Sequence, residues 1–206
     1  MKIHAFILIF VFFCSALSFC DKISFSADFM QGSASETSDK TILERNAHIR
    51  TESFDIYAYR IELEGTNYRY VTATGSVSGK SINSGLDFSC DKLFFDRKTN
   101  LVYFEGKVAV KDDANNVDAT SQLMEYDMNT EIATLQVNVK LNQNQSRGTS
   151  SLAVYKIKDK MVDMTGNPKI VRGEDIFRAQ KITLNIETEE ILLDGKVSGN
   201  VTSEDN

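Results

Sequence analysis

Apolar and polar residues alternate along most of the chain after residue 20. Ile23, Phe25, Ala27 and Phe29 are each separated by one polar residue, which is the two-residue period of a strand with one buried face. The same period continues to the C-terminus, and no window of a dozen residues shows the 3.6-residue period of an amphipathic helix. The pattern predicts an all-β protein made of consecutive strands.

Glycines divide this pattern at regular intervals. Gly75, Gly106, Gly166 and Gly195 are separated by 31, 60 and 29 residues, so one glycine is missing near Val137 from a repeat of about thirty residues. Internal periods of this size are typical of architectures in which one small unit is stacked many times.

Superposition of the units supports the repeat. When residues 90–108 are shifted by 89, Lys92 meets Lys181, Thr99 meets Thr188 and the glycines coincide. Each unit consists of a strand, a polar turn, a strand, a glycine and a further strand, and such short polar turns suit antiparallel hairpins. The glycine marks a bend or bulge, and the apolar parity changes between Cys90 and Leu93. These features favour an antiparallel roll of bent strands over a parallel β-helix.

The first twenty residues form a separate segment. Met1-Lys2 is a short positive start, residues 3–13 are almost wholly apolar, and small residues follow near Ser18. This order is typical of a secretory signal peptide. Two alternatives remain open: an uncleaved membrane anchor and a lipoprotein leader acylated at Cys20. We expect residues 21–206 to form a single exported domain.

Composition and charge exclude several classes of protein. Hydrophobic residues make up 42% of the 206 residues, which is enough for a packed core. The net charge of −6 argues against a nucleic-acid-binding protein, and without Lys2 it becomes −7. Two histidines and three cysteines are too few and too scattered for a zinc site or a disulfide framework, so we expect no metal and no cofactor. His48 is interpreted as structural, and Cys90, which aligns with Ala179, as a small buried residue.

Motifs for catalysis are weak. The segment Gly75–Ser81 resembles a phosphate-binding loop, but its glycines are one residue too close and no helix pattern follows, so we interpret it as a turn. Asp112-Asp113 and Glu189-Glu190 are interpreted as solvated turn charges. The spacing of the paired carboxylates of a glycosidase is set by the fold, so such a pair stays an open alternative. We expect no enzymatic activity.

The order of the segments resembles the OstA-like family. The resemblance is carried by the N-terminal strand, the repeated Gly-Lys-Val after a hairpin, and Gly166–Val171 leading into Ala179–Leu184, and it covers essentially residues 23–201. Asn46 stands where an earlier glycine is expected, and Val137 replaces another. The resemblance implies an open β-jellyroll of consecutive antiparallel strands. It also implies a periplasmic protein that accepts lipopolysaccharide or a related glycolipid from an inner-membrane component and passes it to an outer-membrane component.

A lipid carrier needs a long apolar surface, because one fourteen-carbon chain in water costs on the order of 10 kcal/mol at about 0.8 kcal/mol per CH₂. The inward positions of the repeat supply candidates for a lipid-binding groove, although each of them taken singly is more typical of an ordinary core. These candidates are Phe88, Leu93, Phe95, Val102, Phe104, Met124, Tyr126, Leu135, Met164, Ile182, Leu184, Ile191 and Leu193.

Other functions remain open at this stage. A membrane-anchored OstA-like partner of the same transport system shares the fold, a structural envelope β-roll binds only protein, and an envelope carbohydrate enzyme requires paired acids. An open roll also leaves unpaired first and last strands, at Ile23–Phe29 and Gly195–Thr202, which template another chain. These two strands predict a head-to-tail homo-oligomer that grows as a rod.

Overall fold

The computed structural model describes residues 22–32 and 40–202, and these residues form sixteen strands of a single antiparallel sheet. One 3₁₀ turn, η1, covers Thr66–Tyr68. The predicted signal peptide and Cys20 lie outside the described residues. The strands are β1 Ser24–Ser26, β2 Phe29–Gly32, β3 Lys40–Arg50, β4 Phe54–Glu64, β5 Tyr70–Ser81, β6 Asp87–Asp96, β7 Leu101–Asp112, β8 Val117–Asp127, β9 Ile132–Gln143, β10 Ser146–Lys156, β11 Met161–Thr165, β12 Lys169–Arg172, β13 Asp175–Arg178, β14 Lys181–Asn185, β15 Ile191–Asp194 and β16 Ser198–Asn200.

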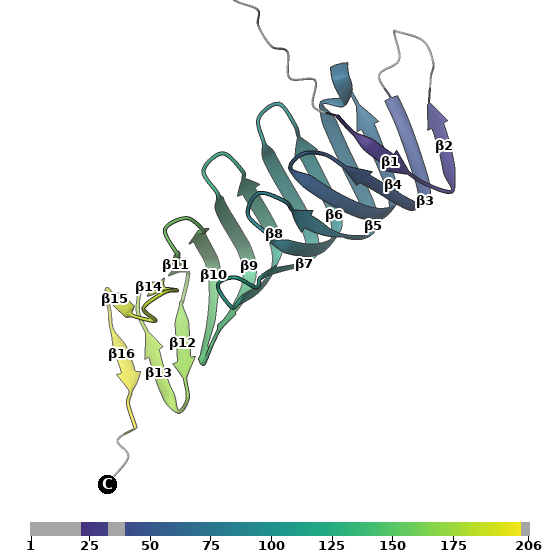
Figure 1. The fold of residues 1–206 in the computed structure, drawn as a ribbon. Helices are drawn as coiled ribbons and strands as arrows, with labels where there is room; N and C mark the ends of the chain where they lie inside the picture. The colour runs from purple at the N-terminus through teal and green to yellow at the C-terminus, as the bar shows by residue number, and fades with distance from the viewer. Residues whose placement is uncertain (1–21, 33–39, 203–206) are drawn as a thin grey trace, which may run out of the picture.

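The sixteen strands form twelve bent strands that stand side by side in chain order. Four of the bent strands are interrupted at the bend, so that β1 continues into β2, β11 into β12, β13 into β14 and β15 into β16; both β1 and β2 pair with β3, and both β11 and β12 pair with β10. The row is open, with β1 and β2 at one end and β15 and β16 at the other (Figure 1). The predicted all-β, open jellyroll is therefore confirmed.

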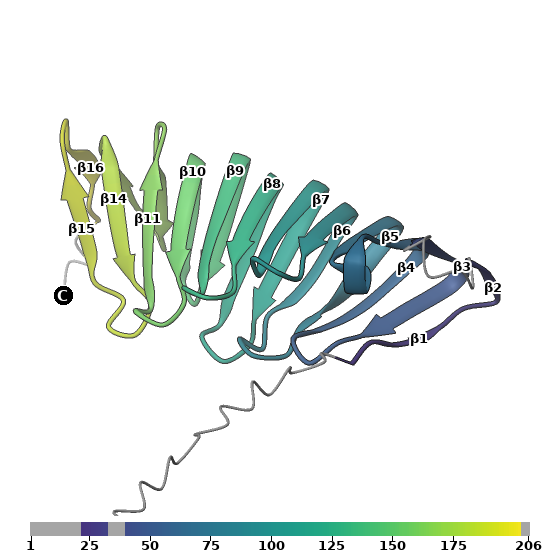
Figure 2. The ribbon, with the colours of Figure 1, turned by 90° about the horizontal axis from the view of Figure 1, so that it is seen from above.

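Each bend divides the row into two leaves. We call leaf A the half that contains residues 101–105 of β7 and 123–127 of β8, and leaf B the half that contains residues 108–112 and 117–121. At the C-terminal end the leaves become separate ribbons, β11–β14–β15 in leaf A and β12–β13–β16 in leaf B. Figure 2 shows β16 behind β15 at this end of the row. The apolar sides of the two leaves face each other and enclose one core.

The bend is a β-bulge that recurs in every second strand. In β7, Glu105 pairs with Leu123 and Val108 with Ser121, so that β7 uses one residue more than β8 between the two pairs. The two bulge residues, Gly106 and Lys107, have φ angles of 76° and 47°. A Cβ atom on Gly106 would lie 2.9 Å from Asp91 Cβ on β6, so glycine is required both by its positive φ and by the close approach of β6. The sequence interpretation of the recurring glycine as a bend is confirmed.

Two details of the sequence interpretation are wrong. The residue that takes the earlier glycine position is Arg45, with a φ of 62°, and Asn46 is the second bulge residue; the missing glycine displaced the alignment by one position. Gly75–Ser81 is not a turn but the second half of β5. Val77 and Ser81 are buried, whereas Ser78 and Lys80 between them are exposed, which is the alternation of a strand.

The polar turns expected after Asp96 and Asp127 are hairpins. Asp96 accepts a hydrogen bond from the backbone N–H of Lys98 at 2.9 Å, and Asp127 accepts one from Asn129 at 2.8 Å. Each carboxylate therefore fixes its hairpin by the Asx-turn mechanism. In the part of the chain that the structure describes, no helix is long and apolar enough to cross a membrane.

Candidate functional site

An unbroken row of apolar side chains runs through leaf A from one end of the molecule to the other. Each residue of this row, which we call the central ladder, lies directly opposite the next residue on the neighbouring strand. With strands about 4.8 Å apart, its twelve residues span roughly 50 Å. The ladder consists of Met30, Leu43, Ile61, Ala73, Leu93, Phe104, Met124, Leu135, Ala153, Met164, Ile182 and Leu193.

The structure brings all thirteen predicted groove residues to this interior. Leu93, Phe104, Met124, Leu135, Met164, Ile182 and Leu193 belong to the central ladder. Phe95, Val102, Tyr126, Leu184 and Ile191 lie on the parallel row of leaf A, two residues closer to the hairpins, and Phe88 lies on leaf B. Eleven of the thirteen are buried, and Ile191 and Leu193 are partly buried against the core at the open end. Their role as a lipid groove stays a prediction.

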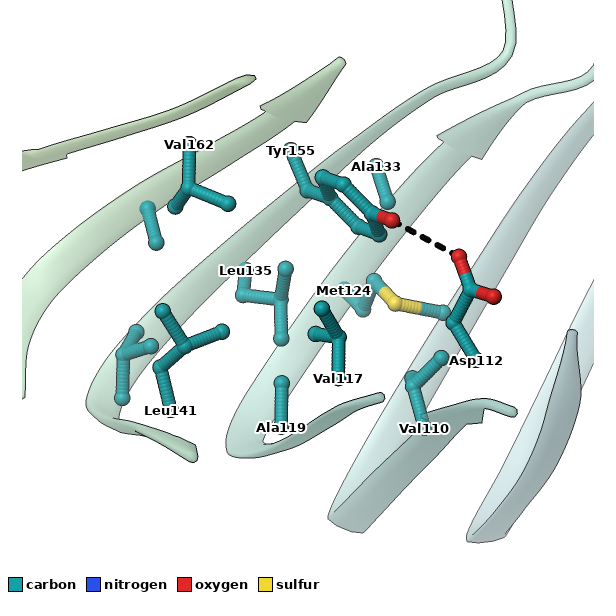
Figure 3. Close-up of a pocket in the computed structure, with 12 residues that line it drawn as sticks. Val110, Asp112, Val117, Ala119, Met124, Ala133, Leu135, Leu141, Tyr155 and Val162 are labelled. Atoms are coloured by element: carbon teal, nitrogen blue, oxygen red, sulfur yellow. Dashed lines mark hydrogen bonds between the residues drawn. The ribbon is translucent and has the colours of Figure 1, made fainter. Parts of the chain in front are cut away.

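Between β7 and β11 the two leaves enclose a narrow cavity (Figure 3). Its walls are apolar, with Leu135 and Met124 from leaf A facing Val117 and Leu141 from leaf B. The free volume is about 10 Å³, which is room for no more than one water molecule. The leaves are therefore in contact here, and an acyl chain fits between them only if they separate.

Two polar side chains enter this apolar cavity. Tyr155 donates a hydrogen bond of 2.7 Å from its hydroxyl to Asp112 Oδ2, as the dashed line in Figure 3 shows. Asn115 also donates to the same oxygen at 2.7 Å. Burial raises the pKa of Tyr155 far above its usual range, and the neighbouring carboxylate of Asp112 raises it further. Tyr155 is therefore a neutral donor at physiological pH.

The interpretation of Asp112-Asp113 as solvated turn charges is wrong for Asp112, which is buried. Its side chain is only 2% exposed, because it is the last inward position of β7 and accepts hydrogen bonds from Tyr155 and Asn115. Asp113 is the exposed member of the pair and contacts Lys111. Tyr155 was missed in the sequence, although it stands 29 residues after Tyr126, at the same position of the repeat.

His48 and Cys90 have structural surroundings. His48 stacks on Tyr57 with ring centroids 4.2 Å apart, and its Nε2 contacts Asp55 across the strand pair. Cys90 is buried, as expected from its alignment with Ala179, and burial raises the pKa of its thiol to about 12. Within residues 22–32 and 40–202, no group of three or more His, Cys, Asp or Glu side chains is arranged to hold a metal ion.

Comparison with protein families identifies this arrangement. Residues 87–190 match the family described as LptA/(LptD N-terminal domain) LPS transport protein, and they make up half of the chain. The chain belongs to this family. The resemblance to the OstA-like family is thereby confirmed, and the LptA/LptD N-terminal family is one of transport proteins, not of enzymes.

A solved structure of low sequence identity also matches the chain. LptH, the LptA homologous periplasmic component of the lipopolysaccharide transport device from Pseudomonas aeruginosa, is 9% identical. The match covers 88% of this chain and 96% of LptH, with a TM-score of 0.28. Among curated proteins, none matches the chain at a significant level. The assignment to the LptA/LptD N-terminal family therefore rests on the family match alone.

Proposed function

We propose that the protein is a periplasmic bridge that carries lipopolysaccharide, or a related glycolipid, along its interior from an inner-membrane to an outer-membrane component. The observation that carries the proposal is the central ladder, together with the family match. Exposure of a fourteen-carbon acyl chain to water costs on the order of 10 kcal/mol of free energy. An apolar row of roughly 50 Å with strands about 4.8 Å apart offers it shelter over the whole length of the molecule.

Both ends of the ladder reach an open edge, which suits transfer between neighbouring molecules. Met30 on β2 is 53% exposed, and Leu193 on β15 is only partly buried. The first bent strand lacks a bulge and the last one has it, at Gly195 and Lys196. A second copy placed after the last strand therefore continues the alternation of bulged and unbulged strands, and also their antiparallel direction.

The repeat predicts the register of this contact between copies. Leu193 corresponds to Phe104 and Met30 to Met124, which are paired in the chain; Ser198 and Ser26 correspond in the same way to the paired Ala109 and Thr120. The ladder of one copy then runs directly into that of the next. Since this contact does not close on itself, it produces rods of increasing length.

The register can be tested with cysteines in a chain whose Cys14 and Cys20 are replaced by serine. Residues directly opposite in antiparallel strands lie about 4.5–5.5 Å apart, within the range of a disulfide. Oxidation of a Ser26→Cys/Ser198→Cys variant should give a series of covalent multimers of increasing size. A Lys22→Cys/Ser198→Cys control is displaced by about 13 Å and should not. Equal cross-linking of both variants would contradict the proposed register.

The lipid itself is tested on protein purified from its native envelope. Mass spectrometry of the bound lipid should find an acylated saccharide, and the purified protein should bind fluorescent lipopolysaccharide in preference to a phospholipid of equal chain length. A structural β-roll that binds only protein predicts neither result. The same sample decides the leader: we expect the intact mass of a chain cleaved near Ser18. Acylation of Cys20 would select a lipoprotein, and retention of residues 1–20 would favour the membrane-anchored partner.

A further inference from the structure

The two leaves are joined in different ways along their two long sides. On one side every bent strand passes from leaf A to leaf B at its bend, so the backbone itself closes that side. On the other side, which we call the rim, the hairpins of leaf A face those of leaf B. Only side-chain contacts and hydrogen bonds close the rim, so it is the side on which the leaves can part without breaking the chain or the sheet.

Three polar rungs repeat along the rim at nearly constant spacing in the sequence. In the first, the hydroxyl of Tyr126 on leaf A lies against Ser81 and Ser84 of leaf B, and Ser84 donates a hydrogen bond of 2.8 Å to Ser81. In the second, Tyr155 donates to Asp112 at 2.7 Å, with Asn115 bonded to both. In both rungs the hairpin residue, Ser84 or Asn115, follows the last residue of its strand by three positions. The partners on leaf B and leaf A are 45 residues apart in the first rung and 43 in the second.

The third rung has a different composition and carries an unsatisfied group. Gln143, which is 1% exposed, donates from Nε2 to the backbone carbonyl of Ile186 at 3.1 Å. This pair again joins leaf B to leaf A across 43 residues. Its Oε1 has no hydrogen-bond partner among the described residues. A buried acceptor without a donor is costly, and opening of the rim would hydrate it. Two further hydrogen bonds join the leaves beside this rung, from Asn144 to Glu189 Oε1 at 2.6 Å and from Arg172 to the backbone carbonyl of Glu189 at 2.7 Å.

A polar row at this place is unusual for a core. At the equivalent position of the preceding repeat, the hydroxyl of Thr51 accepts a hydrogen bond within leaf B from the backbone N–H of Phe54 at 2.9 Å. The contact between the leaves is apolar there, since Phe54 and Phe95 meet with ring centroids 5.2 Å apart. Apolar pairs would close the rim without a buried carboxylate, whose burial has to be offset by its hydrogen bonds. The cavity next to Asp112 and Tyr155 has only about 10 Å³ of free volume, so lipid reaches it only after the leaves separate.

We infer that these three rungs form a latch, and that lipid enters and leaves the interior sideways through the rim as the latch opens. The inference rests on the proposed function, because it assigns a route to the proposed cargo. In the closed state the polar groups within each rung contact each other across the two leaves. In the open state water satisfies the freed polar groups, while the acyl chains cover the apolar walls of the two leaves.

Opening of the rim is measured as a distance between two spin labels. Ala114 lies on the hairpin after β7 in leaf B, and Lys158 on the hairpin after β10 in leaf A; both are exposed. Cysteines at these positions, in the background without Cys14 and Cys20, report the width of the rim. A control pair, Asn129→Cys/Lys158→Cys, lies on two hairpins of leaf A. Addition of rough-form lipopolysaccharide should lengthen the first distance and leave the second unchanged.

The latch is tested further by removing single hydroxyl groups. Tyr155→Phe keeps the ring but removes the donor to Asp112, and a hydrogen bond to a charged group corresponds to about a tenfold change in an equilibrium. Uptake of fluorescent lipopolysaccharide should become about tenfold faster. Ser84→Ala should act in the same direction at the first rung. Tyr103→Phe removes a hydroxyl from an exposed outer tyrosine and should leave the rate unchanged.

The outcomes separate the latch from the proposed function. If lipopolysaccharide binds while the rim distance and the Tyr155→Phe rate stay the same, the cargo enters by the open ends and the latch is wrong. If lipopolysaccharide does not bind to the interior at all, the proposed function fails and the latch fails with it. A longer rim distance together with faster uptake in Tyr155→Phe supports both.

Discussion

At the scale of single residues, Val137 is the clearest departure from the repeat. It takes the bulge position that glycine holds in β5 and β7, with a φ of 65°. A β-branched residue is strained in this region of φ, whereas glycine is not. The strain is local, because Val137 is 46% exposed and packs little.

This strain predicts opposite effects for two matched substitutions. Val137→Gly should stabilise the protein by about 1 kcal/mol, because relief of the left-handed strain outweighs the greater entropy of glycine in the unfolded chain. Gly106→Ala should destabilise it by about 1–3 kcal/mol, because its Cβ has to displace Asp91. Urea unfolding measures both. A loss of stability in Val137→Gly would show that the bulge is not strained.

Asp163 predicts how stability depends on pH. Burial raises the pKa of Asp163, but hydrogen bonds from Thr183, Lys156 and Lys181 outweigh burial and hold it at about 2, below the ordinary 3.8. A lowered folded-state pKa contributes stability that is complete above the ordinary value and is lost as the pH falls towards 2.

We therefore expect the free energy of unfolding to fall between about pH 4 and pH 2, and to fall less steeply in Asp163→Asn. Asp159→Asn, on the exposed hairpin after β10, is the matched control and should keep the wild-type slope. Denaturant titrations at several pH values measure both slopes. Parallel curves for wild type and Asp163→Asn would exclude Asp163 as a source of the acid sensitivity.

At this scale the sequence predicts which apolar residues face inward but not which polar residues do so. Alternation places Phe104 and Leu135 correctly, because each lies inside a long strand. Asp112 and Gln143 are also inward positions, but each ends a strand at a hairpin, where a polar residue is normally solvated. Their burial depends on partners about 43 residues away on the opposite leaf, and local pattern does not contain that information.

At the scale of elements, the strands at the two ends of the row differ from those between them. β1 is three residues long and entirely exposed, and β16 is equally short and exposed. Among the strands that the structure describes, both have one side without a neighbour in the sheet. The repeat predicts the bent strands, because each unit carries the same turns and glycine. It does not predict that the terminal ones are interrupted, since fewer neighbours hold them.

Proline at the first edge should prevent assembly of the rods. Phe25 lies in β1 opposite Ile49, and Phe25→Pro removes a backbone N–H and disfavours the pairing of an additional strand. Sedimentation of the wild type should show species that grow with concentration, whereas Phe25→Pro should stay monomeric with a similar melting temperature. Phe25→Ala is the control and should still assemble. A wild type that stays monomeric at high concentration would contradict head-to-tail assembly.

At the scale of the whole molecule, the open row follows from the repeat, but the closed interior does not. Sequence periodicity predicts that Phe104, Leu135, Met164 and Leu193 occupy equivalent positions, and the register places all four on the central ladder. Whether space remains between the leaves depends on how side chains from both leaves interdigitate. Phe88 and Phe104 do so with their ring centroids 5.1 Å apart. A one-dimensional pattern cannot predict that packing.

Phe104 therefore serves the closed core as well as the proposed route. It is 2% exposed, so a plain core position predicts that Phe104→Asp costs about 3–5 kcal/mol. If the leaves separate readily, water reaches the carboxylate and the loss of stability is smaller, while transfer of lipopolysaccharide is abolished. Thermal melting and a transfer assay on the same variant distinguish the two. Normal transfer by a folded Phe104→Asp protein would exclude the ladder as the path.

The central claim is that lipid travels along the interior of the roll, and site-specific photo-crosslinking tests it most directly. A photo-reactive amino acid at Leu135, which lines the cavity, is compared with one at Tyr103, which lies on the outer face of leaf A and is 42% exposed. During transfer of labelled lipopolysaccharide, we expect a lipid adduct at residue 135 and none at residue 103. Capture of protein alone at residue 135, or equal lipid capture at both positions, would contradict an interior path.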